Sequence, residues 1–386
     1  MERRRPMERR GTMEERGSHD GGGDGGGIVK ALPPDRFIVH GANAEMRWDA
    51  LRGEGLMVPN DLFFVRDHTR TPLIDARAWR LRLFGDGLRG APPRDRAVEF
   101  GYADLLAMPS RTLDAVIECA GNGRALFASQ QDEPAPGIPW TLGAVGAARW
   151  RGVPLAAVLE RAGLRPDAVD VLPTGLDPAC RLGGEDIGRV RRPLPVGKAM
   201  DDVLVAYEMN GVPLPPDHGF PARLVVPGWV GVASIKWLGE IEVARRPLAS
   251  PWTTRMYRMF GPGHPPGGGP PLAEQVAKSA FEFGWDERVP PGRPVTLTGR
   301  SWSPRGPVRR VEVSTDGGAG WRPARLRGGD TGWCRWSLEW WPDRTGPVTL
   351  VARAVDGTGA RQPDRSDFNT EGYLFGAAVR HRVQVG

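Results

Sequence analysis

The chain has 386 residues, with 52 Lys and Arg against 46 Asp and Glu and a formal net charge of +6. This length allows two or three domains with a buried core. Its three cysteines, Cys119, Cys180 and Cys334, form no CxxC pair, which excludes a disulfide-framed fold, a cysteine-rich zinc site and a c-type haem attachment. Basic residues are scattered among acidic ones rather than gathered in a block, which argues against nucleic-acid binding.

Residues 1–30 predict a disordered N-terminal segment. Three near-copies of one unit (MERRRP, MERRGT, MEERGS) precede a glycine run, and this composition is too polar to bury a core. Each copy begins with Met, so several translation starts remain open. No apolar stretch follows the arginine pairs and no window approaches eighteen consecutive apolar residues, so we expect a cytoplasmic protein without a membrane span.

Residues 31–260 predict an α+β domain. The run from Ala115 to Cys119 is typical of a short buried strand that ends in an AGNG loop. The segment PLAAVLERAGL begins at Pro154 and places Leu155, Val158, Leu159 and Ala162 on one helical face, with Gly163 as the predicted stop. DAVDVL and RLVV predict further strands, and Ser234–Val243 predicts strands broken near Gly239. Most polar residues of this domain are expected at strand ends.

The sequence pattern changes after residue 260, from that of an α+β domain to a Pro/Gly-rich stretch followed by short alternating runs. Residues 261–282 include GPGHPPGGGPP and predict a Pro/Gly-rich linker. In residues 283–386, short alternating runs such as PVTLTG, VRRVEVS and VTLVARAV are separated by the turn clusters TDGG and VDGTG. This pattern is typical of an all-β, immunoglobulin-like sandwich, and the length suits one such domain.

Cys119 is the first candidate for chemistry. At a strand end beside a glycine-lined loop, its thiolate could be a nucleophile or a soft metal ligand, and a small buried hydrophobe is the alternative. In FFVRDH, Arg66 and His68 share one side of an extended segment.

Two further fragments add charge and a second histidine. HGFPARLVVPG carries His218 and Arg223, and SIKWLG carries Lys236. One soft ligand, two histidines and several cations at loop ends suit a large anionic cofactor combined with a metal.

The ordered motifs FFVRDH, ECAGNGR, GAVGAARWRGVPL, GLDP, AYEMNGVPLPPDHGFPARLVVPG and SIKWLGEIEV resemble the sulfite oxidase family of molybdopterin-dependent enzymes, followed by that family's immunoglobulin-like dimerisation domain. The resemblance covers residues from about 56 to the C-terminus. It implies that residues 31–260 form the molybdopterin-binding catalytic domain. It also implies that the Cys119 thiolate binds molybdenum together with the two sulfurs of the pterin dithiolene.

The resemblance also implies roles for the other motif residues. Those expected to hold the pterin and its phosphate are Phe64, Val65, Arg66, Asp67, His68, Asp177, His218, Arg223, Ser234, Ile235 and Lys236. Those expected to line a small anion pocket beside the metal, and to form the catalytic set with Cys119, are Arg66, Arg124, Trp140 and Tyr257.

The implied reaction is oxygen-atom transfer to sulfite or a related small sulfur compound, with arginines offsetting the charge of the anion. The chain has no CxxCH and no upstream region long enough for a cytochrome b5-like unit, so we expect no haem in this chain and a separate electron acceptor such as a cytochrome. A homodimer is expected through the C-terminal domain. Its tryptophans either form that interface or fill the sandwich core: Trp302, Trp321, Trp333, Trp336, Trp340 and Trp341.

Three positions depart from the family pattern. Glu371, in FNTEG, stands where sulfite-specific members carry an arginine; Asp67 stands where Asn is usual; and Gly123 stands where many members carry another arginine. A carboxylate near a dianion repels it, so these changes leave the identity of the sulfur substrate open.

Three alternatives remain beside the oxidase. A molybdopterin-dependent reductase of S-oxides or N-oxides shares the family, but the C-terminal domain favours the oxidase. A non-catalytic anion-binding protein is disfavoured by the intact Cys119, His218, Arg223 and Lys236. A cysteine hydrolase needs a histidine base near Cys119, and the cofactor better explains both histidines.

Overall fold

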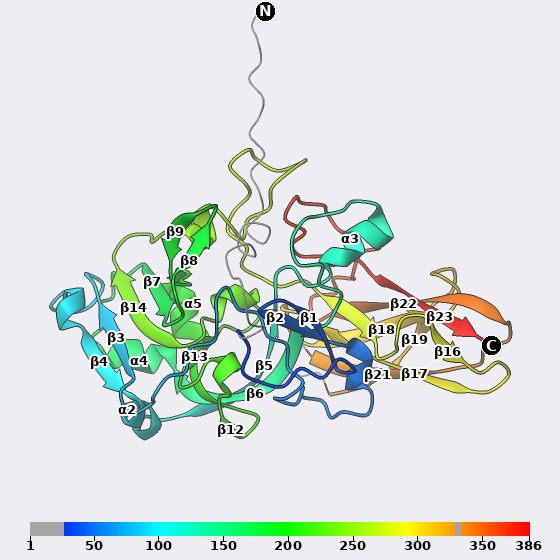
Figure 1. Cartoon of the computed structure of the whole chain (residues 1–386), viewed down its shortest axis with the longest axis horizontal. Coiled ribbons are helices and arrows are strands. Elements are labelled where there is room, and N and C mark those ends of the chain that lie inside the picture. Colours follow the sequence, from blue (N-terminus) through cyan, green and yellow to red (C-terminus); the bar gives the residue numbers. More distant parts are fainter. Residues whose placement is uncertain (1–26, 329–332) are drawn as a thin grey trace, which may run out of the picture.

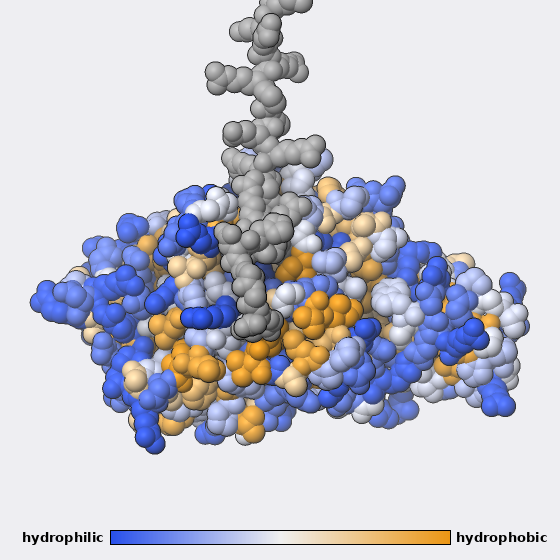
Figure 2. Space-filling model, viewed as in Figure 1, coloured by the Kyte–Doolittle hydropathy of each residue, from blue (hydrophilic) through white to orange (hydrophobic). Residues whose placement is uncertain are grey.

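The computed structural model describes residues 27–328 and 333–386. Figure 1 shows two lobes side by side: an N-terminal lobe that ends after α6 (Pro251–Thr254) and a C-terminal lobe built from β15 to β23. Within the described ranges, the longest helices fall short of the length and apolarity needed to cross a membrane. Figure 2 shows hydrophilic residues over both ends of the face in view and hydrophobic residues gathered near its middle.

The end of the segment predicted to be disordered is ordered, which corrects that prediction for residues 27–30. The backbone N–H groups of Val29 and Lys30 donate hydrogen bonds of 2.8–3.1 Å to the carboxylate of Asp217. The polar composition of this segment gave no sign of a partner so far along the chain. Residues 1–26 lie outside the described residues.

A five-stranded sheet forms the outer part of the N-terminal lobe, in the order β10-β7-β14-β3-β4. Strand β14 runs parallel to β3, and the other pairs are antiparallel. The helices α2, α4 and α5 bury Leu105, Leu159 and Ala199 in the same core cluster as residues of this sheet. Their bounds, with those of the strands, are β3 Arg80–Phe84, β4 Val98–Gly101, α2 Tyr102–Ala107, α4 Leu155–Arg161, β7 Asp170–Gly175, β10 Leu194–Pro195, α5 Val196–Asp201 and β14 Leu238–Ala244.

A second sheet lies nearer the centre of the molecule. Its strand order is β12-β11-β6-β5, and β13 also pairs with β11. Strand β6 approaches β11 so closely that a Cβ on Gly152 would lie 2.1 Å from the carbonyl oxygen of Val205, which explains the glycine. The bounds are β5 Arg111–Glu118, β6 Val145–Pro154, β11 Leu204–Met209, β12 Val212–Pro213 and β13 Arg223–Val225. Two hairpins, β1–β2 and β8–β9, and helix α3 complete the lobe: β1 Phe37–His40, β2 Asn43–Met46, α3 Arg124–Gln131, β8 Cys180–Leu182 and β9 Glu185–Gly188.

The N-terminal lobe is mostly β with short helices, so the predicted α+β class overstates the helix content. The helix after Pro154 is present as α4, and the predicted strand at Ala115 is the end of the longer β5. Strand β14 begins only at Leu238, with a register shift before Glu240, whereas Ser234 to Trp237 lie outside the strand. Those four residues line the pocket described below instead.

The C-terminal lobe consists of two sheets that share one core. The sheets have the orders β15-β17-β21-β20 and β16-β23-β22-β18-β19. Leu297 and Trp336 from the first sheet and Val311, Leu350 and Val383 from the second belong to the same buried cluster. The bounds are β15 Lys278–Phe281, β16 Glu287–Val289, β17 Val295–Trp302, β18 Val308–Ser314, β19 Arg322–Pro323, β20 Arg325–Arg327, β21 Trp333–Trp340, β22 Gly346–Asp356 and β23 Val379–Val385.

The start of this lobe differs from the sequence prediction. Residues 278–281, predicted as the end of a linker, form β15 and pair antiparallel with β17. All four are buried, including Lys278 and Ser279, so β15 lacks the alternation by which strands are recognised.

The two lobes share a buried interface. Trp48 of the N-terminal lobe packs against Trp302 and Trp333, with ring centroids 5.6 and 6.3 Å away. Arg300, fully buried with its partner Glu282, donates hydrogen bonds to the carbonyls of Leu56 and Gly55 at 2.7 and 2.9 Å. These C-terminal tryptophans therefore pack within the chain.

Candidate active site

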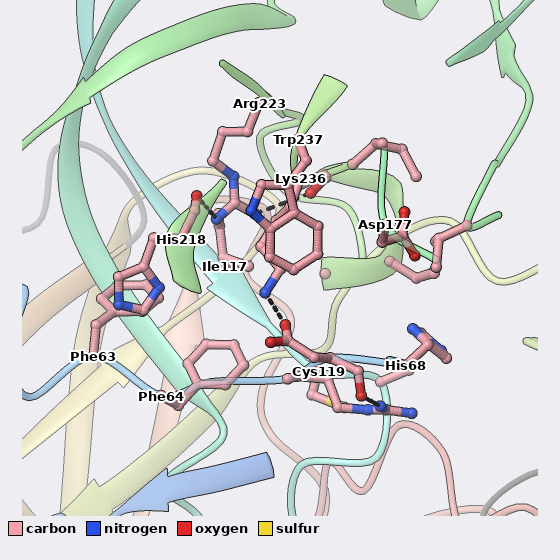
Figure 3. A pocket seen from close by; sticks show the side chains of 18 of the residues that line it. Phe63, Phe64, His68, Ile117, Cys119, Asp177, His218, Arg223, Lys236 and Trp237 are labelled. Atoms are coloured by element: carbon pink, nitrogen blue, oxygen red, sulfur yellow. Dashed lines mark hydrogen bonds and ion pairs between the residues drawn. The ribbon is translucent and has the colours of Figure 1, made fainter. Parts of the chain in front are cut away.

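One pocket lies where β5 and β13 meet the loop of residues 231–237. It encloses about 730 Å³ of space, counting its open mouth. In Figure 3, Lys236 lies between His218 and Asp177, and Cys119 lies across the pocket from Arg223. The predicted site residues that line this pocket are Phe64, Arg66, Asp67, His68, Cys119, Asp177, His218, Arg223, Ser234, Ile235, Lys236 and Tyr257.

The other three predicted residues are not among those that line the pocket. Val65 is buried and its N–H donates to the carbonyl of Ala44 at 2.9 Å. Trp140 is fully buried. Arg124 is also buried, and its guanidinium donates to the carbonyls of Ile138 and Glu371, each at 2.9 Å. A direct substrate contact by Arg124 or Trp140 thus remains a prediction.

Strand β5 carries Cys119 to the pocket. The Cys119 N–H donates to the carbonyl of Ala144 at 2.9 Å, and its own carbonyl accepts from Asn122 at 2.9 Å, so the chain turns sharply after the cysteine. Gly121 in this turn lies close to Arg124, since a Cβ there would lie 2.8 Å from Nη2 of that arginine. The Cys119 side chain faces the pocket, whereas burial raises the pKa values of the Cys180 and Cys334 thiols to about 12.

Lys236 and Arg223 are the two cations in the wall of the pocket across from Cys119. Nζ of Lys236 contacts the carboxylate of Asp67 and donates to the carbonyl of Asp217 at 2.7 Å. The Arg223 guanidinium donates to the carbonyls of His218 and Ser234 at 3.0 and 2.9 Å. Burial lowers the pKa of Arg223 to about 9 and also lowers the pKa of Lys236, although nearby Asp67 opposes both shifts. An anion bound here would offset that cost of burial.

Nε2 of His218 and Oδ1 of Asp177, both from residues that line the pocket, lack hydrogen-bond partners within the described part of the chain. Burial, with nearby Lys30, Lys236 and Arg223, lowers the pKa of His218 well below its usual value, so the imidazole is neutral at pH 7. Burial raises the pKa of Asp177 to about 6. Buried polar groups are normally hydrogen-bonded, so both atoms indicate a polar ligand. The heteroatoms and amino group of a pterin fit them.

Tyr257 also lines the pocket. Its hydroxyl lies 3.0 Å from Nε2 of His68, and its ring stacks on Tyr373 at 5.4 Å. Tyr257 and Trp237 both adopt positive φ angles, 51° and 49°, which side-chain-bearing residues rarely do. Such strain is common at binding sites.

The sequence prediction missed several wall residues: Phe63, Ile117, Ala120, Val190, Gly231, Val232 and Trp237. Most of them lie next to a predicted motif residue in the sequence, and this adjacency was the one sign that they belong to the pocket. Val190 gave none, because it lies in a separate segment that meets β7 through an isolated bridge between Arg191 and Thr174. Lys30, half-buried beside Asp217, was also missed, and burial lowers its pKa to about 7.

The donor set near Cys119 constrains any metal there. Among residues 27–328 and 333–386, no group of three or more His, Cys, Asp or Glu side chains could hold a metal ion. A metal bound to Cys119 therefore needs ligands from outside the described chain. A pterin dithiolene supplies soft sulfur ligands of that kind.

Comparisons with known proteins agree with this geometry. The family model "Oxidoreductase molybdopterin binding domain" matches residues 68–252, and "Mo-co oxidoreductase dimerisation domain" matches residues 281–386. The chain is 36% identical over 335 residues to a sulfite oxidase of Gallus gallus, covering 81% of this chain and 70% of that protein. The chain belongs to the sulfite oxidase family of molybdopterin oxidoreductases. The resemblance inferred from the motifs is thus confirmed, and with it the molybdenum-molybdopterin cofactor.

Two further relatives of this family member are informative. It is 34% identical over 354 residues to the mitochondrial sulfite oxidase of Mus musculus, covering 86% of this chain but only 62% of the mouse protein. It also resembles the crystal structure of the sulfane dehydrogenase SoxCD from Paracoccus pantotrophus, with a TM-score of 0.73 and 27% identity over 91% of this chain and 88% of that one. The mostly β architecture is therefore that of the family.

Proposed function

We propose that this protein transfers an oxygen atom to sulfite or another small sulfur compound and passes the electrons to a separate acceptor such as a cytochrome. One observation carries the proposal: the Cys119 side chain opens into the same pocket as Arg223, Lys236 and the two unpartnered atoms of His218 and Asp177. A soft ligand, cations and polar acceptors in one pocket suit a phosphorylated metal cofactor.

Each side of the pocket has its own task in this proposal. Arg223 and Lys236 bind the phosphate of the pterin, and His218 and Asp177 hydrogen-bond its polar edge. Cys119 supplies the protein's thiolate ligand. When bound, the molybdenum cofactor supplies the oxygen-atom transfer and takes up two electrons.

The substrate end is formed by Arg66, Tyr257 and His68, with Arg124 behind them. Arg66 lines the pocket and its Nη1 donates to Asn43 at 3.2 Å, which orients the guanidinium. Burial and the nearby Arg66 and Lys236 lower the pKa of His68 well below its usual value. A neutral His68 leaves the arginine as the charge that attracts an anion, while Tyr257 provides a hydrogen bond near the reacting atoms.

Glu371 favours a second candidate substrate. Its carbonyl accepts a hydrogen bond from Nε of Arg124, which places the residue beside a cation of the implied substrate pocket. A carboxylate there disfavours a dianion. We therefore propose sulfane sulfur, the substrate named for the dehydrogenase of similar structure, as the alternative to sulfite.

We also propose that the C-terminal lobe, residues 278–386, is an immunoglobulin-like sandwich that forms a homodimer. The matching family model is named a dimerisation domain, which supports the homodimer. The buried core shared by the two sheets of the lobe supports the sandwich. Trp341, 63% exposed on this lobe, is available for such a contact. A monomeric mass at micromolar concentration would contradict the dimer.

Reduction of an artificial electron acceptor tests the reaction. The purified, cofactor-loaded protein should reduce the acceptor when given sulfite or a persulfide, and the ratio of the two kcat/KM values identifies the substrate. Fast S-oxide or N-oxide reduction with a viologen donor, together with negligible activity on both sulfur substrates, would show that the protein is a reductase instead.

A further inference from the structure

A buried ion pair connects the C-terminal lobe to the residue that precedes Cys119. Oε1 of Glu118 lies 2.6 Å from Nζ of Lys278, and the two side chains are only 3% and 2% exposed. Glu118 is the last residue of β5, and Lys278 is the first residue of β15 in the other lobe. The pair thus crosses the interface between lobes directly beneath the pocket.

Hydrogen bonds extend the pair to both sides of Cys119. Nζ of Lys278 also donates to the carbonyl of Asn122 at 2.8 Å, and Nδ2 of Asn122 donates to Oε1 of Glu118 at 2.9 Å. Nε1 of Trp302, again from the C-terminal lobe, donates to Oε2 of Glu118 at 2.9 Å. One lysine and one tryptophan therefore hold the residue before Cys119 and, through Asn122, the end of its turn.

The loop is confined from other directions as well. The N–H of Ala144 donates to Oδ1 of Asn122 at 3.1 Å. On the pocket side, a Cβ on Gly231 would lie 2.9 Å from the Glu118 carbonyl oxygen, so Gly231 packs tightly against the backbone. With both flanks fixed, the direction of the Cys119 side chain depends on where Lys278 and Trp302 hold Glu118.

Stability alone is a poor explanation for this pair. Removing two charges from water costs several kcal/mol per ion. Replacing a buried ion pair by apolar residues of similar size often leaves the stability of the folded protein unchanged or raises it. A hydrogen-bonded ion pair, by contrast, fixes the orientation of the two side chains, because each donor and acceptor has a preferred geometry.

We propose that Lys278 and Trp302 are positioning residues for Cys119, so that the C-terminal lobe sets the geometry of the thiolate ligand. This inference rests on the proposed role of Cys119 as the metal ligand. The C-terminal lobe then has a part in the metal site in addition to any part in dimer formation. Groups that orient metal ligands in this way typically change metal affinity or activity by about 10- to 100-fold when removed.

The test compares Lys278→Met with a matched control, Arg300→Met. Arg300 lies on the neighbouring strand, paired through Ala280, and forms an equally buried ion pair with Glu282. Its other hydrogen bonds reach the carbonyls of Leu51, Gly55 and Leu56 rather than the Cys119 loop. Both variants therefore break a buried ion pair in the interface, but only Lys278→Met releases the loop.

The first readout needs no cofactor. The full chain is expressed in a host that cannot make the cofactor, and the alkylation rate of Cys119 by iodoacetamide is followed by peptide mass spectrometry, which separates it from Cys180 and Cys334. We expect Lys278→Met to change this rate by about tenfold or more, the low end of the orienting effect. Arg300→Met should stay close to the unmodified chain.

The second readout is the spectrum of the loaded protein. Lys278→Met should shift the thiolate-to-metal charge-transfer band and the electron paramagnetic resonance signal of the one-electron-reduced metal, and Arg300→Met should leave both unchanged. Equal alkylation rates and equal spectra in the two variants would overturn the proposal. Absence of molybdenum from the unmodified protein would instead contradict the proposed function, and the alkylation result would still decide whether Lys278 positions the loop.

A double variant covers the case in which Lys278→Met does not fold. Lys278→Met leaves Glu118 as an unpaired buried charge, which is strongly destabilising, whereas Glu118→Gln with Lys278→Met removes both charges. We expect the double variant to fold and to show the same altered Cys119 reactivity. Unaltered reactivity in the folded double variant would contradict the inference.

Discussion

The hydroxyl oxygen of Tyr257 lies 3.0 Å from Nε2 of His68, and both side chains line the pocket that Cys119 faces. Since burial lowers the pKa of His68 well below its usual value, the imidazole in this hydrogen bond is neutral. It fixes the direction of the tyrosine hydroxyl beside the site proposed for the sulfur anion.

Tyr257→Phe should lower kcat/KM for the sulfur substrate by about 10²-fold, as expected when one preorganised donor to a reacting oxygen is lost. Steady-state reduction of an artificial acceptor measures the effect. Tyr102→Phe, a tyrosine at the start of α2 away from the pocket, is the matched control and should behave like the unmodified protein. Equal activity in both variants would remove Tyr257 from the catalytic set.

Cys119→Ser should abolish turnover while the protein stays folded, because a serine hydroxyl is a hard, protonated replacement for a soft thiolate. Cys334→Ser is the control: this cysteine lies in the core of the C-terminal lobe and its thiol is inert. Circular dichroism checks folding, and acceptor reduction checks activity. Retained activity in Cys119→Ser would show that another group binds the metal.

The sequence predicted those parts of the site that lie within short motifs. Cys119 stood out because an apolar run ends there before AGNG, and His218, Arg223 and Lys236 stood out as chemistry-bearing residues in short fragments. The local patterns left their roles open, and the resemblance of the ordered motifs to a known family supplied those roles.

The sequence could not show which distant residues meet. Lys278 reads as a linker residue, yet it is buried against Glu118, 160 positions away. The N-terminal contact of Lys30 with Asp217 spans 187 positions and left no periodic signal. The lobe interface was missed for the same reason, since its polar groups resemble surface residues until their partners are known.

Glu371→Gln should lower KM for sulfite about 3- to 10-fold, because it removes a negative charge from the residue whose backbone carbonyl accepts from Arg124. Substrate titration measures the change, and Glu371→Arg should lower KM further. Glu274→Gln, which breaks the exposed ion pair with Arg305, is the control for a general charge effect. An unchanged KM in both Glu371 variants would mean that this side chain points away from the substrate.

The stability of the cofactor-free chain should fall as the pH drops below 6.5. The folded pKa of His218 lies well below its usual 6.5, so the folded state cannot take up the proton that the unfolded state binds. This contribution is therefore fully present above pH 6.5 and lost as the pH falls. Relative to His218→Gln, the chain should lose up to about 1.4 kcal/mol of unfolding free energy per pH unit below 6.5, measured by urea titration.

Asp177 should give a pH dependence of stability opposite in sign to that of His218. Its folded pKa of about 6 lies above the usual 3.8, so its contribution is present at low pH and lost as the pH rises through 6. Asp177→Asn should therefore match the unmodified chain near pH 4 and lack the loss of stability that the unmodified chain shows as the pH rises through 6. Identical pH profiles for both variants and the unmodified chain would contradict the burial of these two groups.

We infer that the pocket beside Cys119 holds a molybdenum-pterin cofactor. Metal analysis of the protein purified from a host that makes the cofactor tests it most directly, with the Arg223→Met variant as the comparison. We predict close to one molybdenum per chain, together with the pterin, in the unmodified protein, and a marked loss of both in the variant that lacks the phosphate-binding cation. Absence of molybdenum from the unmodified protein would contradict the claim.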